Sequence, residues 1–223
     1  MSTVILVGMP EEKEILTGAF PTTLVLSGTD KISLPKLVPP DCTRIVVSGL
    51  FGGLAPGIPV GGICAATTIV DRGEIVFVCD QVWNDAVVAA GKAAGLQFGC
   101  VPWYSSGIMD QADTASQRAY LHKKYGVGAI DDEARFAVAL ANARHIQCND
   151  FRSCSDDYTE TLPLAARGAI MNSDGSANIS YLLHEIATEP AYQTLDLIKI
   201  GWDFGTSLHT LEYACNVVKG VFL

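Results

Sequence analysis

Short runs of β-branched and other apolar residues recur along this chain, and several of them stop at glycine. Residues 3–8 (TVILVG), 22–28 (TTLVLSG) and 43–49 (TRIVVSG) have the length of buried strands, and glycine lets the backbone turn where each run ends. The first run leads into a helix-like segment that carries Glu11 and Glu12 in its first turn. This beginning is typical of an open α/β sheet.

The rest of the chain continues the alternation of strand and helix. Further strands are predicted at 63–71, 74–80, 98–106, 126–131 and 145–155, and helices at 81–96, 114–125, 132–144, 179–186 and 195–218. Residues 162–178 form the one long predicted loop, and such loops often border a site. The pattern predicts a single α/β domain over residues 1–223, with three layers in which helices cover both faces of a twisted, mostly parallel or mixed sheet.

Composition and charge narrow the class of partner. The chain is 49% hydrophobic and 17% charged, so it can bury a large core. Its formal net charge of −9 disfavours nucleic acid and anionic membrane surfaces, which attract clusters of Lys and Arg. No apolar run is long enough to predict a membrane span. We therefore expect a cytoplasmic protein with a small-molecule ligand.

Cysteine and histidine give no metal or disulfide pattern. The seven cysteines are scattered singly without a C-x-x-C pair, which predicts reduced and mostly buried thiols. The four histidines are isolated and are interpreted as structural or surface residues: His122, His145, His184 and His209. We expect no metal and no organic cofactor.

Carboxylates follow several of the predicted strands. Glu12, the run Asp131 to Glu133, and the pair Asp156 and Asp157 in "DFRSCSDDYTE" all lie where a parallel sheet releases the chain, which is where ligands bind. Acids that converge from separate strands suit general acid and base catalysis, because crowding and burial raise a carboxyl pKa toward neutrality. Helix caps and solvated turns are the alternative interpretation of the same residues.

An ordered set of motifs favours the first interpretation. These motifs are "VGMPEEKEI" at 7–15, "SGLFGGLAPGIPVGG" at 48–62, the long segment "SSGIMDQADTASQRAYLHKKYGVGAIDDEARFAVA" at 105–139, "FRSCSDD" at 151–157 and "LPLAARGAIMNSDG" at 162–175. In this order and spacing, the chain resembles the nucleoside phosphorylase and nucleosidase superfamily, which includes 5′-methylthioadenosine/S-adenosylhomocysteine nucleosidase. It most resembles the branch of phosphorylases associated with hopanoid biosynthesis.

The resemblance implies roles for four acids. Asp156, in the pattern "RSCSD", is expected to bond to or protonate N7 of a purine, whereas Asp157 is interpreted as solvated. Glu12 is expected to be the base that activates water or steadies a sugar hydroxyl, with Glu11 or Glu14 as substitutes. Glu133 is expected to accept hydrogen bonds from the ribose hydroxyls. Asp132 beside it stands where the family usually has Met, which adds charge near the sugar.

The resemblance also implies an anion-binding turn and a wall for the base. Gly49, Leu50, Gly52 and Gly53 match the loop whose amides hold phosphate or a replacing water. Leu50 and Val47 stand where a hydroxyl residue and an arginine often occur, so hydrolysis is at least as expected as phosphorolysis, although Arg152 or Arg44 can supply a charge. The base wall is assigned to Trp103, Tyr104, Asp110 and Gln111, and the two aromatic residues fit a core role equally well.

These observations predict an enzyme that cleaves the N-glycosidic bond of a purine nucleoside by hydrolysis or phosphorolysis, with phosphate as an optional co-substrate. The family commonly forms homo-oligomers, and we expect a dimer or a larger ring. The alternative is a non-catalytic nucleoside-binding or storage protein with the same fold, which Asp132 and Leu50 favour. Dinucleotide binding is disfavoured because residues 48–57 lack the G-x-G-x-x-G register before a helix.

Overall fold

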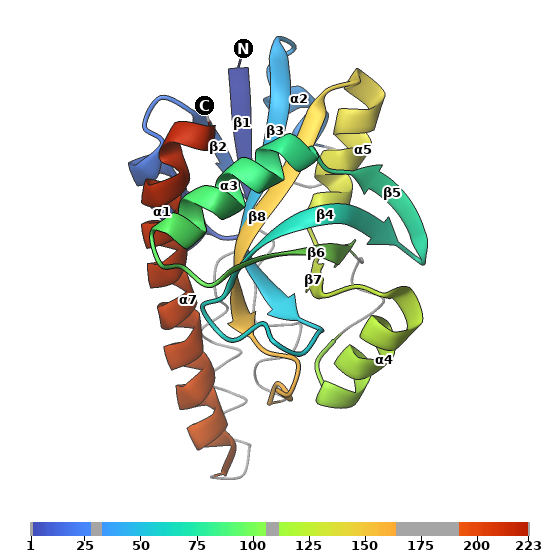
Figure 1. Cartoon of the computed structure of the whole chain (residues 1–223), viewed down its shortest axis with the longest axis vertical. Coiled ribbons are helices and arrows are strands. Elements are labelled where there is room, and N and C mark those ends of the chain that lie inside the picture. The colour runs from blue at the N-terminus through green and yellow to red at the C-terminus, as the bar shows by residue number, and fades with distance from the viewer. Residues whose placement is uncertain (1, 28–32, 106–111, 164–191, 223) are drawn as a thin grey trace.

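The computed structural model describes residues 2–27, 33–105, 112–163 and 192–222 of the chain (Figure 1). Its strands are β1 (Ser2–Val7), β2 (Leu24–Ser27), β3 (Cys42–Gly53), β4 (Ile63–Asp71), β5 (Glu74–Val78), β6 (Phe98–Ser105), β7 (Ala129–Asp131) and β8 (Gln147–Asp156). Its helices are α1 (Pro10–Ala19), α2 (Leu34–Leu37), α3 (Gln81–Ala93), α4 (Ala115–Tyr125), α5 (Ala134–Arg144) and α7 (Tyr192–Phe222). The alternation predicted from the sequence is therefore confirmed.

The eight strands form one mixed sheet. Its order is β2-β1-β3-β7-β6-β4-β5, and β8 pairs with both β3 and β4. Five of the pairings are parallel, and the antiparallel ones are β3 with β7, β4 with β5, and β4 with β8. The prediction of a mostly parallel or mixed sheet is confirmed.

Part of this sheet closes on itself. Strand β3 pairs with β8, β8 with β4, β4 with β6, β6 with β7, and β7 returns to β3. The expectation of an open sheet is therefore wrong for these five strands. Long strands that twist strongly bring distant strands into pairing range, and a closed ring leaves fewer unpaired strand edges.

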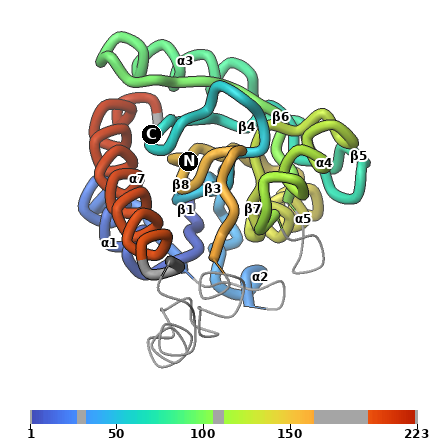
Figure 2. Tube along the Cα trace, turned by 90° about the horizontal axis from the view of Figure 1, so that it is seen from below, coloured from blue at the N-terminus to red at the C-terminus, as the bar shows by residue number. Residues whose placement is uncertain are grey.

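Helices cover both faces of the sheet. Along β1, Val4 and Leu6 enter one core and Ile5 and Val7 enter the other, as the two-residue period of a strand requires. The first core also contains residues of α2 and α5, whereas the second contains residues of α1, α3 and α7. Figure 2 shows α1 and α7 beside each other, with α5 on the opposite side of the strands.

Strand β3 is longer than the sequence suggests. Gly49, Leu50, Gly52 and Gly53, where we predicted a loop, lie inside this strand. Parallel pairing with β8 runs through Gly52, and antiparallel pairing with β7 uses Gly52 and Gly53. The predicted anion-binding loop is therefore wrong as local structure, because strand pairing on both sides holds this backbone extended.

Two helices differ from the predictions, one in its bounds and one in its presence. Helix α7 begins and ends beyond the predicted range 195–218, and the short helix α2 was not predicted. The predicted helix 179–186 and most of the predicted loop 162–178 lie outside the described residues. All seven cysteines are free, and six are buried, which confirms the prediction of mostly buried thiols. Within the described ranges, no helix is long and apolar enough to cross a membrane.

Candidate active site

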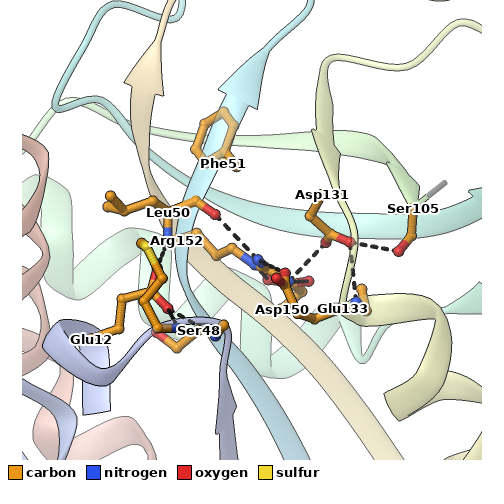
Figure 3. Close-up of polar contacts among 12 residues, drawn as sticks. Glu12, Ser48, Leu50, Phe51, Ser105, Asp131, Glu133, Asp150 and Arg152 are labelled. Atoms are coloured by element: carbon orange, nitrogen blue, oxygen red, sulfur yellow. Dashed lines mark hydrogen bonds and ion pairs between the residues drawn. The ribbon is translucent and has the colours of Figure 1, made fainter. Parts of the chain in front are cut away.

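A buried carboxyl group at the start of α1 forms one wall of the candidate site. Glu12 is 2% exposed, and its Oε2 accepts hydrogen bonds from the backbone N–H groups of Gly8 and Met9 at 2.8 and 2.9 Å. Its Oε1 accepts a third bond, 2.8 Å long, from the N–H of Leu50 on β3 (Figure 3). Burial, and then the charge of Glu133, raise the pKa of Glu12 from 4.5 to about 7, although the amide bonds act in the opposite direction. A carboxyl with this pKa is suited to accept a proton from water at neutral pH.

Two glycines leave the room that the site carboxyls occupy. Gly49 has a φ of 134°, and a Cβ at this position would lie 2.5 Å from Oε1 of Glu12. A Cβ at Gly8 would lie 2.6 Å from Oε1 of Glu133. Glycine therefore allows the backbone of β3, and of the turn between β1 and α1, to approach both acids closely.

A buried guanidinium joins three carboxylates beside Glu12. Arg152 on β8 donates to both carboxylate oxygens of Asp150 at 2.9 and 3.3 Å and to Asp131 at 2.9 Å. Its Nη1 donates to Oε2 of Glu133 at 2.8 Å and to the carbonyl of Leu50 at 3.2 Å. Burial raises the pKa of Asp150 well above its ordinary value, against the effect of Arg152. The positive charge of Arg152 is thus engaged by neighbouring carboxylates.

The turn between β7 and α5 places the acids of the "DDE" run differently. Asp131 accepts hydrogen bonds from the hydroxyl of Ser105 and from the N–H of Ala134, so it is the one that caps the start of α5. The side chain of Glu133 does not cap α5; its carboxylate instead accepts a hydrogen bond from Arg152. Asp132 is exposed, yet the desolvation of its carboxyl, and then Glu133, raise its pKa to about 6.

These groups line one cavity of about 270 Å³ at the ends of β3, β7 and β8. Its lining includes four of the acids described above, together with Arg152, and the apolar side chains of Met9, Leu50, Phe51, Ile130 and Phe204. The acids are Glu12, Asp131, Asp132 and Glu133. The lining therefore combines carboxyl groups with apolar side chains, which suits a sugar that carries a hydrophobic group.

Asp156 lies next to this cavity, at the end of β8. Its neighbour Ser155 lines the cavity and donates a hydrogen bond to Oδ1 of Asp156. The Asp156 carboxylate forms an ion pair with Arg118 of α4, and its Oδ2 would lie 3.2 Å from a Cβ placed on Gly52. Asp157 instead accepts two bonds from the backbone and hydroxyl of Thr159 in the following turn. Of the two aspartates, the structure brings Asp156 to the site.

The predicted aromatic base wall is corrected by the structure. Trp103 and Tyr104 are both 0% exposed and belong to two different apolar cores. Trp103 packs against Phe51, and Tyr104 stacks on Tyr125 with ring centroids 4.9 Å apart. Neither lines the cavity, so the core interpretation holds for both. The buried ring of Trp103 contacts the site only through Arg152, whose guanidinium lies 5.4 Å from the ring centre.

Other candidate residues lie elsewhere or outside the described ranges. Asp110 and Gln111 belong to residues 106–111, which the structure does not describe. Arg44 lies near the opposite end of β3, where it bonds to Gln147, so it supplies no charge to the cavity. Glu11 and Glu14 line a separate groove between α1 and α7. Among the three glutamates of α1, only Glu12 enters the site.

Sequence reasoning missed three residues that shape the site. Asp150 precedes Arg152 by two residues in a strand, so both side chains point to the same face, and this spacing was a usable signal. Arg118 and Phe204 reach the site from α4 and α7, and no local pattern indicates which helical residues turn toward a distant strand end.

The fold is similar to that of solved nucleosidases, which confirms the fold that the resemblance implied. The chain is similar to 5′-methylthioadenosine/S-adenosylhomocysteine nucleosidase from Neisseria meningitidis in complex with methylthio-immucillin-A, with 15% identity, a TM-score of 0.65, and coverage of 98% of this chain and 99% of that chain. It is also similar to futalosine hydrolase of Helicobacter pylori, with 13% identity, a TM-score of 0.64, and coverage of 96% of this chain and 97% of that chain. A third similar structure is 5′-methylthioadenosine/S-adenosylhomocysteine nucleosidase of Campylobacter jejuni, with 13% identity, a TM-score of 0.62, and coverage of 97% of this chain and 99% of that chain. No family model and no curated protein matches the sequence.

Proposed function

We propose that this protein hydrolyses the N-glycosidic bond of a purine nucleoside. The observation that carries the proposal is the Glu12 carboxyl, which is buried, held by three backbone amides and given a pKa of about 7 in the wall of an acidic cavity. The likeness of the fold to nucleosidases and to futalosine hydrolase supports the same class of reaction. It supports the bond type rather than the identity of the base.

In the proposed reaction the bond between C1′ of the ribose and N9 of the purine breaks, and its electron pair leaves with the base. Asp156 gives a proton to N7, which makes the base a better leaving group. Water bonds to C1′ and passes a proton to Glu12. Glu133 accepts hydrogen bonds from the ribose hydroxyls, while the carboxylates around the cavity stabilise the positive charge that develops on the sugar.

Two features favour water over phosphate as the nucleophile. The amide of Leu50, which was expected to help bind an anion, already donates to Glu12. The guanidinium of Arg152 is engaged by Asp131, Asp150 and Glu133, so it offers little net charge to a second anion. A phosphate dianion would lose water without gaining a free cation, and this desolvation is costly.

Product chromatography tests the proposal. Adenosine, methylthioadenosine and inosine are incubated with the protein, with and without phosphate, and free base is measured for the wild type, Glu12→Gln and Asp156→Asn. We expect release without phosphate and a loss of about 100-fold or more in both variants. Release only with phosphate would establish a phosphorylase. Binding of these nucleosides without release of base would support the alternative of a non-catalytic binding protein.

A further inference from the structure

Arg118, which does not line the cavity, contacts Asp156, the proposed proton donor. Arg118 on α4 is 1% exposed, and its Nη2 forms an ion pair with Oδ2 of Asp156. Its Nη1 lies within hydrogen-bond distance of the backbone carbonyls of Gly53 at 3.1 Å and of Asp156 and Asp157 at 3.3 Å. One buried guanidinium thus holds the end of β3, the end of β8 and the Asp156 side chain together.

Hydrogen bonds also hold the start of helix α4 in position. Thr114 caps its first turn through reciprocal bonds with Gln117. The N–H of Leu162 donates to the carbonyl of Asp113 at 2.7 Å, and the N–H of Ala115 donates to Thr161 at 3.3 Å. Because the chain just after Asp156 is bound to the start of α4, Arg118 and Asp156 are held at a set separation from both sides.

Building on the proposed function, we infer that Arg118 is a positioning residue for Asp156. It fixes the Asp156 carboxyl group beside Gly52. Transfer of a proton from Asp156 to N7 leaves a carboxylate, and a neighbouring guanidinium stabilises that product. Arg118 therefore favours the proton transfer that releases the base, and it acts through Asp156 without contacting the reacting atoms.

The other charged and titratable groups near Asp156 do not replace this effect. From the segment after β8, Glu160 adds a negative charge, but Lys199 of α7 forms an ion pair with it and also with Asp203. From β8 itself, the buried thiol of Cys154 has a raised pKa, chiefly through burial, and stays neutral near pH 7. Among the residues that the structure describes, Arg118 is the cation in direct contact with the Asp156 carboxylate.

The test compares two leaving groups. A purine needs a proton to leave, whereas 4-nitrophenolate leaves from a 4-nitrophenyl riboside without one. The wild type, Arg118→Gln, Arg118→Met and Arg118→Lys are assayed on adenosine, or the best purine nucleoside found, and on the nitrophenyl riboside. Arg118→Met fills the aliphatic volume if Arg118→Gln does not fold, and Arg118→Lys keeps the charge without the fork of donors.

We expect the two uncharged variants to lose about tenfold more activity on the purine nucleoside than on the nitrophenyl riboside. Arg118→Lys, which keeps a cation beside Asp156, should restore much of the activity on the purine nucleoside. Equal losses on the two substrates would show a merely structural role and overturn the inference. A wild type that cleaves neither substrate would instead refute the proposed function, and the inference with it.

Discussion

The substitution Glu12→Gln separates the charge of this side chain from its shape. The pKa of Glu12 is raised to about 7 by burial and then by Glu133. Between pH 4.5 and about 7, the folded protein therefore keeps a proton that the unfolded chain releases. Because the folded state binds more protons in this window, Glu12 lowers the free energy of unfolding as the pH rises through it.

The magnitude follows from the width of that window. At about 1.4 kcal/mol per pH unit, the interval from 4.5 to about 7 corresponds to a loss of about 3 kcal/mol. Glutamine is neutral at every pH and has no such loss. It has only one acceptor oxygen for three N–H donors, those of Gly8, Met9 and Leu50, so at least one buried donor loses its partner. That adds a cost of about 1–3 kcal/mol at all pH values.

We therefore expect the variant to be less stable than the wild type near pH 4, and to gain about 3 kcal/mol relative to it by about pH 8. Urea unfolding at several pH values measures this difference directly. Glu11→Gln is the matched control, because Glu11 is exposed on the same turn of α1 and should show no comparable gain. A constant difference between Glu12→Gln and the wild type across this range would refute the reasoning.

Three further predictions concern the same region. Gly49→Ala should displace the Glu12 carboxyl and reduce activity about 100-fold, whereas Gly57→Ala, also at positive φ but in open space, should reduce stability alone; kinetics and melting curves separate the two. Glu133→Gln should raise KM about tenfold if this acid binds the ribose hydroxyls, as initial-rate kinetics would show. Trp103→Phe should lower the melting temperature by several degrees, about 1–2 kcal/mol, without raising KM, and the reverse outcome would restore a base-stacking role.

Much of the fold was predictable because its signals are local. The continuous apolar run of β1 and the acids at the first turn of α1 appear in consecutive residues. The closure of five strands into a ring was not predictable, since it depends on the pairing of β8 with β3 and β4, which both lie far from β8 in the chain. The same pairing turned the expected glycine loop at residues 48–53 into strand.

The candidate site shows the same division between local and distant information. Strand-end position indicated a group of acids, and the family resemblance singled out Glu12, Glu133 and Asp156 among them. The structure places Glu12 and Glu133 in one cavity with Asp156 beside it. For Trp103 and Tyr104 the sequence left a base wall and a core role equally open, because it does not show which side chains of a strand are buried; both are 0% exposed.

The sequence by itself determined which residue types stand at the ends of strands and where glycine permits a close approach of the backbone. Only the tertiary structure decided the charge state and the partners of those residues. The pKa of Glu12 depends on exclusion of water by β3 and on the position of Glu133, and the ion pair of Asp156 depends on a helix that begins 41 residues earlier in the chain. Burial and Coulomb interactions act through space, so they follow the packed structure and not the order of residues.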